Sequence, residues 1–207
     1  MKKLLEDIEQ LKKSQIKNII DNRIKEFKQN RKKSNKEIFK ELCFCILTAN
    51  FNAKRSIEIQ NKIDDGFLNL SESKLSKKLS EYGHRFPNTR AHYIVEARKY
   101  KDSLKDIINS ENKDQLREWL VKNIKGFGYK ESSHFLRNIG FENIGIIDFH
   151  IIDILTRYKI IKKPKILTKR KYLEIEKILE KIAKKLNMTL SELDLYLWYI
   201  ETGKILK

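Results

Sequence analysis

The sequence predicts an all-α protein. Only two prolines and seven glycines occur among its 207 residues, so few positions oppose helix formation. Most segments repeat apolar residues with the 3.6-residue period of a helix that buries one face. No run of 18 apolar residues occurs, so none of these helices is expected to span a membrane.

The N-terminal half is predicted to form six helices. They span residues 4–11, 16–27, 36–50, 53–63, 72–82 and 90–108. The third reads KEIFKELCFCILTAN and is apolar nearly all round after Phe39, which is typical of a helix at the centre of a bundle. Ser34 is its candidate N-cap. Pro87 marks a loop, and Asn88 or Thr89 is the candidate cap of the sixth helix.

The C-terminal half is predicted to form five helices. They span residues 113–124, 129–139, 149–159, 171–186 and 190–202. Asp148 is a good N-cap for the third of these, and Thr189 with Glu192 fits a capping box at the start of the last. Gly203 is expected to end the last helix.

The chain carries a large excess of positive charge. It has 45 lysines and arginines against 28 aspartates and glutamates, which gives a net charge of +17. Such an excess favours a polyanionic partner, most often nucleic acid, because lysine and arginine displace the counterions condensed on phosphates. A lysine-rich proteome, such as a thermophile's, would give the same composition, so motifs have to decide between the two.

Two cysteines, Cys43 and Cys45, lie in the apolar third helix. Their side chains point in different directions on a helix, which suits neither a disulfide nor a shared metal ion. We expect both to be small core residues of a protein from a reducing compartment. Two cysteines are also too few to hold an iron–sulfur cluster. The first residues, MKKLLEDIEQ, lack the apolar stretch of a signal peptide, and we expect a cytoplasmic protein.

A turn with two glycines joins two predicted helices in residues 123–135, NIKGFGYKESSHF. Gly126 and Gly128 are able to take positive φ and to let another backbone come close. The amides after the turn begin a helix and point outward at its positive end, where phosphates bind. A helix–hairpin–helix at about residues 113–139 indicates DNA binding. An ordinary helical corner, with glycines used for packing, is the alternative.

Lys130 follows this turn, and Asp148 comes eighteen residues later in IIDFH. This spacing, together with the loop GFENIGIID, resembles the helix–hairpin–helix DNA glycosylases over roughly residues 36–158. The loop has Gly140 and Gly145 but lacks the proline of the family's pattern.

The position of Lys130 resembles the bifunctional branch of that superfamily. In that branch the lysine amine attacks the anomeric carbon, displaces the base and forms a Schiff base that permits β-elimination of the strand. The resemblance therefore implies that Lys130 is the nucleophile. It also implies that the Asp148 carboxylate takes up a proton or stabilises positive charge on the sugar, in addition to capping its helix.

The C-terminal segment DLYLWYIETGKILK suggests which base is removed. Asp194 and Trp198 lie four residues apart on one helix face, where an indole ring can stack on an extruded purine and a carboxylate can accept its N–H groups. The short chain and the terminal GKILK resemble the archaeal-type (type 2) 8-oxoguanine DNA glycosylases, whose last residue, here Lys207, reaches the base pocket. His134, one turn after Lys130, is expected to line the same pocket. Core packing is the alternative for Trp198 and His134.

Five further residues are candidate DNA contacts. Arg85 and Phe86, in HRFPNTR, are candidates to fill the space that an extruded nucleotide leaves. Asn50 and Arg55 occupy positions where the eukaryotic-type relatives contact the base opposite the lesion. His150, two residues after Asp148, is a candidate phosphate contact.

The resemblance also implies a monovalent cation in the hairpin. Its ligands would be the backbone carbonyls of Lys122, Ile124 and Phe127. We expect no metal ion and no organic cofactor to take part in the chemistry itself.

We expect two helical subdomains with a DNA-binding cleft between them. Residues 34–149 would form the bundle that carries the hairpin, and residues 1–33 with 150–207 would form the second subdomain. The activity that the resemblance implies is excision of 8-oxoguanine from double-stranded DNA and cleavage at abasic sites. We expect a monomer without membrane contact, in the cytoplasm of a prokaryote and associated with its nucleoid. The alternatives are a glycosylase of the same superfamily for another lesion, such as an oxidised pyrimidine, and a non-catalytic hairpin protein that only binds DNA.

Overall fold

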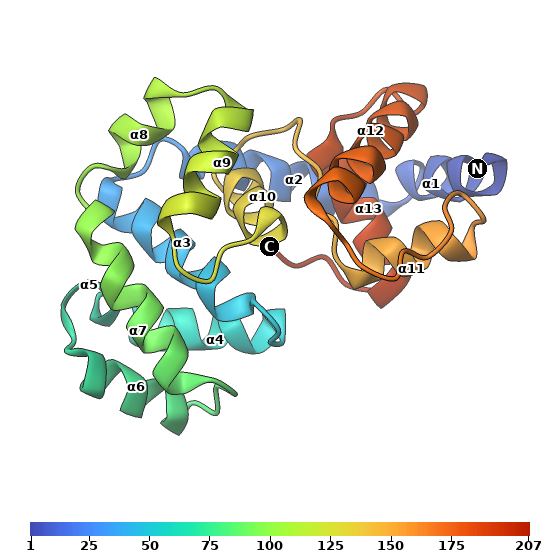
Figure 1. Cartoon of the computed structure of the whole chain (residues 1–207). Coiled ribbons are helices and arrows are strands. Elements are labelled where there is room, and N and C mark those ends of the chain that lie inside the picture. The colour runs from blue at the N-terminus through green and yellow to red at the C-terminus, as the bar shows by residue number, and fades with distance from the viewer. The chain divides into compact units, whose positions relative to one another are not determined.

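The computed structural model describes all 207 residues. Thirteen α-helices and one 3₁₀ turn follow one another with no strand between them (Figure 1), which confirms the predicted all-α class. The chain forms two compact units. One consists of residues 29–139, and the other combines residues 1–28 with residues 140–207. None of the helices has both the length and the apolar character that crossing a membrane would require.

The unit of residues 29–139 is a bundle around one buried helix. Its elements are α3 (Asn35–Thr48), α4 (Ala53–Ile63), α5 (Gly66–Asn69), α6 (Glu72–Glu81), α7 (Pro87–Ala97), η1 (Arg98–Tyr100), α8 (Leu104–Ser110), α9 (Lys113–Asn123) and α10 (Tyr129–Asn138). Every residue of α3 from Ile38 to Thr48 is buried, and the helix packs on α4, α5, α7, α8 and α10. This confirms the prediction of a central helix, in which Cys43 and Cys45 are buried core residues.

The other unit is built from both ends of the chain. Its helices are α1 (Lys2–Lys12), α2 (Gln15–Asn30, which continues into the first unit), α11 (Phe149–Arg157), α12 (Lys169–Lys185) and α13 (Leu190–Thr202). α13 packs on α11 and on α12. Hydrogen bonds tie the N-terminal helix to the C-terminal part: Lys12 Nζ donates to the Leu186 carbonyl at 2.9 Å, and the Tyr158 hydroxyl donates to Asp7 at 2.5 Å.

This division places residues 140–149 with the terminal helices, whereas the sequence suggested a boundary after residue 149. Asp148 therefore lies in the same unit as Trp198 and Lys207, and Lys130 lies in the other. That the two units are independent subdomains stays a prediction.

Most predicted helix ends are confirmed. Ser34 caps α3, Thr189 and Glu192 form the capping box of α13, and Gly203 ends α13 with φ +69°. The single helix predicted over 90–108 is wrong, because the chain there forms α7, η1 and α8 in succession. The predicted loop at Pro87 and the predicted cap at Asn88 or Thr89 are also wrong, because α7 begins at Pro87 and its N-cap is Phe86. Proline suits this first position, since the amide hydrogen that it lacks would have no partner within the helix. The four-residue α5 was not predicted.

Candidate active site

The hairpin consists of α9, the turn at residues 124–128 and α10. The Phe127 amide donates to the Ile124 carbonyl at 3.1 Å and closes the turn. Gly126 has φ +84°, and a Cβ added there would lie 2.6 Å from Cδ2 of Tyr93 on α7. The turn therefore requires glycine at this position twice over, for its backbone conformation and for its close approach to an aromatic ring.

Gly128, which is able to take positive φ, does not do so here. It has φ −104° and ψ −167° and is the N-cap of α10. Its amide donates to the Glu131 carboxylate at 3.2 Å, so in the free protein this amide is hydrogen-bonded to an acidic side chain of the hairpin itself. The sequence signal for this contact was the three-residue spacing of a capping box, which we did not recognise because the cap is a glycine.

Lys130 lies in the first turn of α10, as predicted. Its side chain is 24% exposed, and its Nζ lies 3.8 Å from Glu131 Oε1. The side chain is thus partly buried yet accessible, and a carboxylate lies beside its amine. Glu131 is the contact to Lys130 that sequence reasoning missed.

His134, one turn further along α10, is 7% exposed and faces the core of its unit. Its ring lies edge-on to Phe44 of α3, with 5.6 Å between the ring centroids. The structure thus gives His134 a packing contact, and its place in a base pocket stays a prediction.

Asp148 caps α11, as predicted. Its Oδ1 accepts a hydrogen bond from the Ile151 amide at 3.0 Å. A carboxylate has about four acceptor sites, so this bond leaves the second oxygen able to accept a proton or to face a positive charge.

The loop of residues 140–148, which leads to Asp148, is held by two side chains of α12. The Tyr172 hydroxyl donates to the Gly145 carbonyl at 2.8 Å and accepts from the Ile147 amide at 3.1 Å. Glu176 Oε1 accepts from the Gly145 amide at 2.8 Å. Both side chains are buried. These two residues position the backbone just before Asp148, and nothing in their sequence pattern indicates more than an amphipathic helix.

Aromatic rings gather at the start of α11, the helix that Asp148 caps. His150 stacks on Phe149 with 3.9 Å between ring centroids, and it lies edge-on to Trp198 at 4.7 Å. The indole Nε1 of Trp198 is buried and has no hydrogen-bond acceptor in the protein. His150, predicted as a phosphate contact, therefore also supports the ring that we predicted to bind the base.

The remaining base-pocket candidates also belong to the unit of the chain ends. Asp194 lies on α13 one turn before Trp198, and Lys207 is the last residue of the tail that follows Gly203. Both side chains are partly exposed.

The candidate contacts to the opposite strand lie in the unit of residues 29–139. Asn50 is exposed and has φ +57°, and Arg55 is exposed on α4 with its guanidinium 5.7 Å from the Phe51 ring centroid. The guanidinium of Arg85 lies 4.9 Å from the Phe86 ring centroid.

A buried histidine, His84, fixes the backbone of the loop that carries Arg85 and Phe86. Its Nε2 lies 3.0 Å from the Leu47 carbonyl, and its Nδ1 accepts from the Phe86 amide at 3.1 Å. A ring with Nε2 protonated and Nδ1 bare satisfies both contacts. Burial lowers the pKa of His84, with a smaller contribution from Arg90 and Arg55, and so favours this neutral form.

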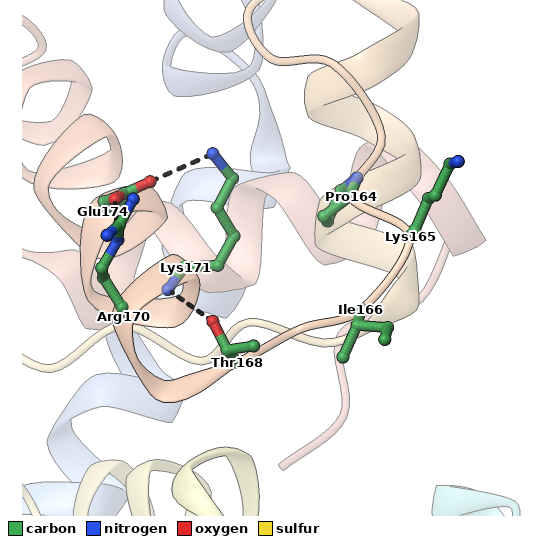
Figure 2. Close-up of a pocket in the computed structure, with 7 residues that line it drawn as sticks. All are labelled: Pro164, Lys165, Ile166, Thr168, Arg170, Lys171 and Glu174. Carbon is green, nitrogen blue, oxygen red and sulfur yellow. Dashed lines mark hydrogen bonds and ion pairs between the residues drawn. The ribbon is translucent and has the colours of Figure 1, made fainter.

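Two open grooves of the surface contain none of these residues. One, of about 510 Å³, lies between the loop before α12 and the first turns of that helix (Figure 2), where Lys171 pairs with Glu174. The other, of about 870 Å³, lies between α6 and the start of α7. The predicted residues thus do not coincide with either groove.

A lysine presented by a helix–hairpin–helix, with an aspartate capping a later helix, places this chain among proteins of the helix–hairpin–helix DNA glycosylase class. The family model described as 8-oxoguanine DNA glycosylase matches residues 20–188. The chain belongs to this family.

The relatives are similar over nearly their whole length. An 8-oxoguanine DNA glycosylase/AP lyase of Korarchaeum cryptofilum is 55% identical over 99% of this chain and 98% of its own. The crystal structure of the Methanocaldococcus jannaschii 8-oxoguanine glycosylase/lyase, in complex with a 15mer DNA containing 8-oxoguanine, has a TM-score of 0.96 and 55% identity and covers 99% of each chain. The crystal structure of the Thermotoga maritima 8-oxoguanine DNA glycosylase has a TM-score of 0.94 at 40% identity, over 100% of this chain and 99% of that one.

Proposed function

We propose that the protein excises 8-oxoguanine from double-stranded DNA and cleaves the strand at the resulting abasic site. The relatives that match this chain over almost their full length are named 8-oxoguanine DNA glycosylase/AP lyase. The similar structure from M. jannaschii is a complex with DNA that contains 8-oxoguanine. The observation on the protein itself that carries the proposal is the position of Lys130, whose side chain is partly buried in the first turn of the hairpin helix.

In the proposed reaction, Lys130 is the nucleophile. Its Nζ forms a bond to C1′ of the damaged nucleotide, and the bond between C1′ and the base breaks, with the electron pair leaving on the base. Opening of the sugar then gives a protonated Schiff base. Loss of a proton from C2′ and departure of the 3′ phosphate complete the β-elimination.

We propose that Asp148 assists this reaction electrostatically. Its carboxylate either takes up a proton or stabilises the positive charge that develops on the sugar as the base leaves. The helix cap uses only one of its two oxygens, so capping and chemistry do not compete.

We further propose that the base pocket includes Trp198, Asp194, Lys207 and His134. Trp198 supplies a stacking surface for the extruded base. Asp194 supplies an acceptor for the N–H edge of guanine.

The proposed DNA contacts are the hairpin around Gly126 and Gly128 together with Asn50, Arg55, Arg85, Phe86 and His150. The carbonyls of Lys122, Ile124 and Phe127 remain candidate ligands for a monovalent cation. They fit this role, because oxygen ligands suit hard cations and the Ile124 carbonyl, which already accepts from the Phe127 amide, keeps a second lone pair.

Borohydride trapping tests the proposed reaction. The wild-type protein, incubated with an 8-oxoguanine duplex and borohydride, is expected to form a covalent adduct. Lys130→Gln should lose the adduct and retain DNA binding, whereas Lys125→Gln, an exposed lysine of the same hairpin, should still cross-link. An adduct of equal yield with Lys130→Gln would show that another residue is the nucleophile.

Removal of Lys207 tests the choice of lesion. We expect the shortened chain to lose far more 8-oxoguanine excision than lyase activity on a preformed abasic site. Equal losses in both assays would contradict a role of Lys207 in the base pocket. We propose that the protein acts as a monomer on the nucleoid in the cytoplasm, and its mass in solution by light scattering would test the first part.

A further inference from the structure

One aromatic side chain next to Asp148 is exposed without an evident structural reason. Phe149, the first residue of α11, is 65% exposed. The isoleucines and the leucine that follow it on the same helix are buried. Four other large apolar residues of the chain are similarly exposed, and all of them are aliphatic or methionine: Met1, Ile19, Ile166 and Leu167.

The Phe149 ring also lies against a neighbouring ring. It stacks on His150 at 3.9 Å between centroids with an interplanar angle of 37°, and His150 in turn lies edge-on to Trp198 of α13 at 4.7 Å. The exposed ring therefore sits at the end of a chain of three aromatic rings, whose inner end is anchored on a packed helix. A flat apolar surface that is both exposed and held in orientation is suited to bind another flat group.

The neighbouring groups indicate what that flat group is. Phe149 directly follows Asp148, the carboxylate proposed to act on the sugar of the damaged nucleotide. A nucleotide extruded from a duplex loses the stacking of its neighbours and regains it on aromatic side chains of the enzyme. In the free protein, part of the Trp198 ring is already in contact with His150, so the most accessible aromatic surface beside Asp148 is that of Phe149.

We propose that Phe149 stacks on the extruded nucleotide and contributes to its capture before Lys130 attacks. This inference rests on the proposed function. It adds a substrate-contacting residue distinct from Phe86, which we assign to the space that the nucleotide vacates. His150 is then a positioning residue for Phe149 as well as a candidate phosphate contact.

Lesion binding without reaction gives the direct test. In a Lys130→Gln background, Phe149→Ala should weaken binding to an 8-oxoguanine duplex about tenfold, the size expected for loss of one base–aromatic stack. Binding to the matched undamaged duplex should change less than about twofold, since no base is held outside that helix. Phe149→Tyr should restore lesion binding, and Phe149→Leu, which keeps apolar bulk without a ring face, should not. Equal weakening on both duplexes, or full rescue by leucine, would overturn the proposal.

A second measurement separates substrate contact from an indirect effect on Asp148. In the otherwise unmodified protein, Phe149→Ala should slow release of 8-oxoguanine in single turnover about tenfold and leave borohydride trapping on a preformed abasic site nearly unchanged. A parallel loss in trapping would mean that Phe149 acts through Asp148 and would overturn the stacking role.

The matched control is Ile166→Ala. Ile166 is 76% exposed in the loop before α12 of the same unit (Figure 2) and should affect none of these measurements. If the wild-type protein released no 8-oxoguanine, the proposed function would fail, whereas the binding comparison would still decide the role of Phe149.

Discussion

The two segments that carry the proposed catalytic residues are built in opposite ways. The hairpin that carries Lys130 is closed by contacts between near neighbours, Phe127 with Ile124 and Gly128 with Glu131. The loop that leads to Asp148 has no regular structure of its own, and it is held by Tyr172 and Glu176, which lie 25 to 31 residues further along the chain.

This difference separates what a sequence can reveal from what only a fold can. A contact across three residues leaves a fixed spacing in the sequence, whereas a contact across thirty residues leaves none. We therefore expect substitutions in the hairpin to act locally, and substitutions in α12 to act at a distance on Asp148.

The largest effect is expected from Asp148→Asn. Asparagine caps a helix about as well as aspartate, so α11 should keep its start and the free energy of unfolding should change by less than about 0.5 kcal/mol. The negative charge is lost, however, and removal of one group that stabilises transition-state charge typically slows a reaction about 10²- to 10³-fold. Single-turnover release of 8-oxoguanine measures this effect.

Asp148→Ala provides the contrast. It removes the charge and the cap together, so it should be as slow as the asparagine variant and also less stable by about 1 kcal/mol. Full activity of Asp148→Asn would assign Asp148 to helix capping alone.

The next largest effect is expected from Tyr172→Phe. The ring remains, but the Ile147 amide and the Gly145 carbonyl lose a buried hydrogen-bond partner, at a cost of about 2–4 kcal/mol in unfolding free energy. Excision should slow because Asp148 follows this backbone directly. Urea unfolding and single-turnover kinetics measure the two effects.

Glu176→Gln is the matched control for Tyr172→Phe. The glutamine carbonyl can still accept from the Gly145 amide, so excision should stay close to wild type. If Tyr172→Phe kept full activity and stability, the loop would not depend on the Tyr172 hydroxyl.

The same distinction explains which features could be predicted from sequence. The central helix α3, the caps at Ser34 and Asp148, and the position of Lys130 in the first turn after the hairpin all follow from local patterns, and the structure has each of them. Tyr172 was indistinguishable from any other residue of an amphipathic helix, because its partners lie in a loop that the sequence does not place. The break of the predicted helix 90–108 into α7, η1 and α8 was missed because its apolar period continues across it.

Gly126→Ala tests the hairpin side of the comparison. Alanine at φ +84° costs about 1–2 kcal/mol, and its Cβ would displace Tyr93 as well. Thermal unfolding should show this loss, and affinity for undamaged duplex DNA should fall with it. Gly128→Ala is the matched control, because Gly128 has negative φ and a Cβ there would meet only Glu131 Oε2 at 3.4 Å. Equal destabilisation by both substitutions would contradict the assigned roles of the two glycines.

The smallest effect is expected from substitution of His84, in the unit of residues 29–139. Here too a buried side chain holds a loop by contacts distant in sequence, since His84 Nε2 meets the Leu47 carbonyl. Burial lowers the pKa of His84 below its ordinary value of 6.5. Below pH 6.5 the unfolded chain therefore takes up a proton that the folded chain does not. The stability contributed by neutral His84 is complete above pH 6.5, is lost as the pH falls from 6.5 to the folded pKa, and is constant below it.

Urea unfolding at pH 7.5 and pH 5.5 measures this contribution. The wild-type protein should lose more stability between these two values than His84→Gln, which cannot take up the proton. Protonation at Nδ1 also removes the acceptor of the Phe86 amide, so the loop with Arg85 and Phe86 should loosen before the unit unfolds. Faster amide exchange at Phe86 relative to neighbouring amides at the lower pH would show that His84 holds this loop, as Tyr172 is expected to hold the Asp148 loop. An identical pH dependence of stability in wild type and His84→Gln would contradict this role of His84. The loop would then be held by its own local turn, as the hairpin is.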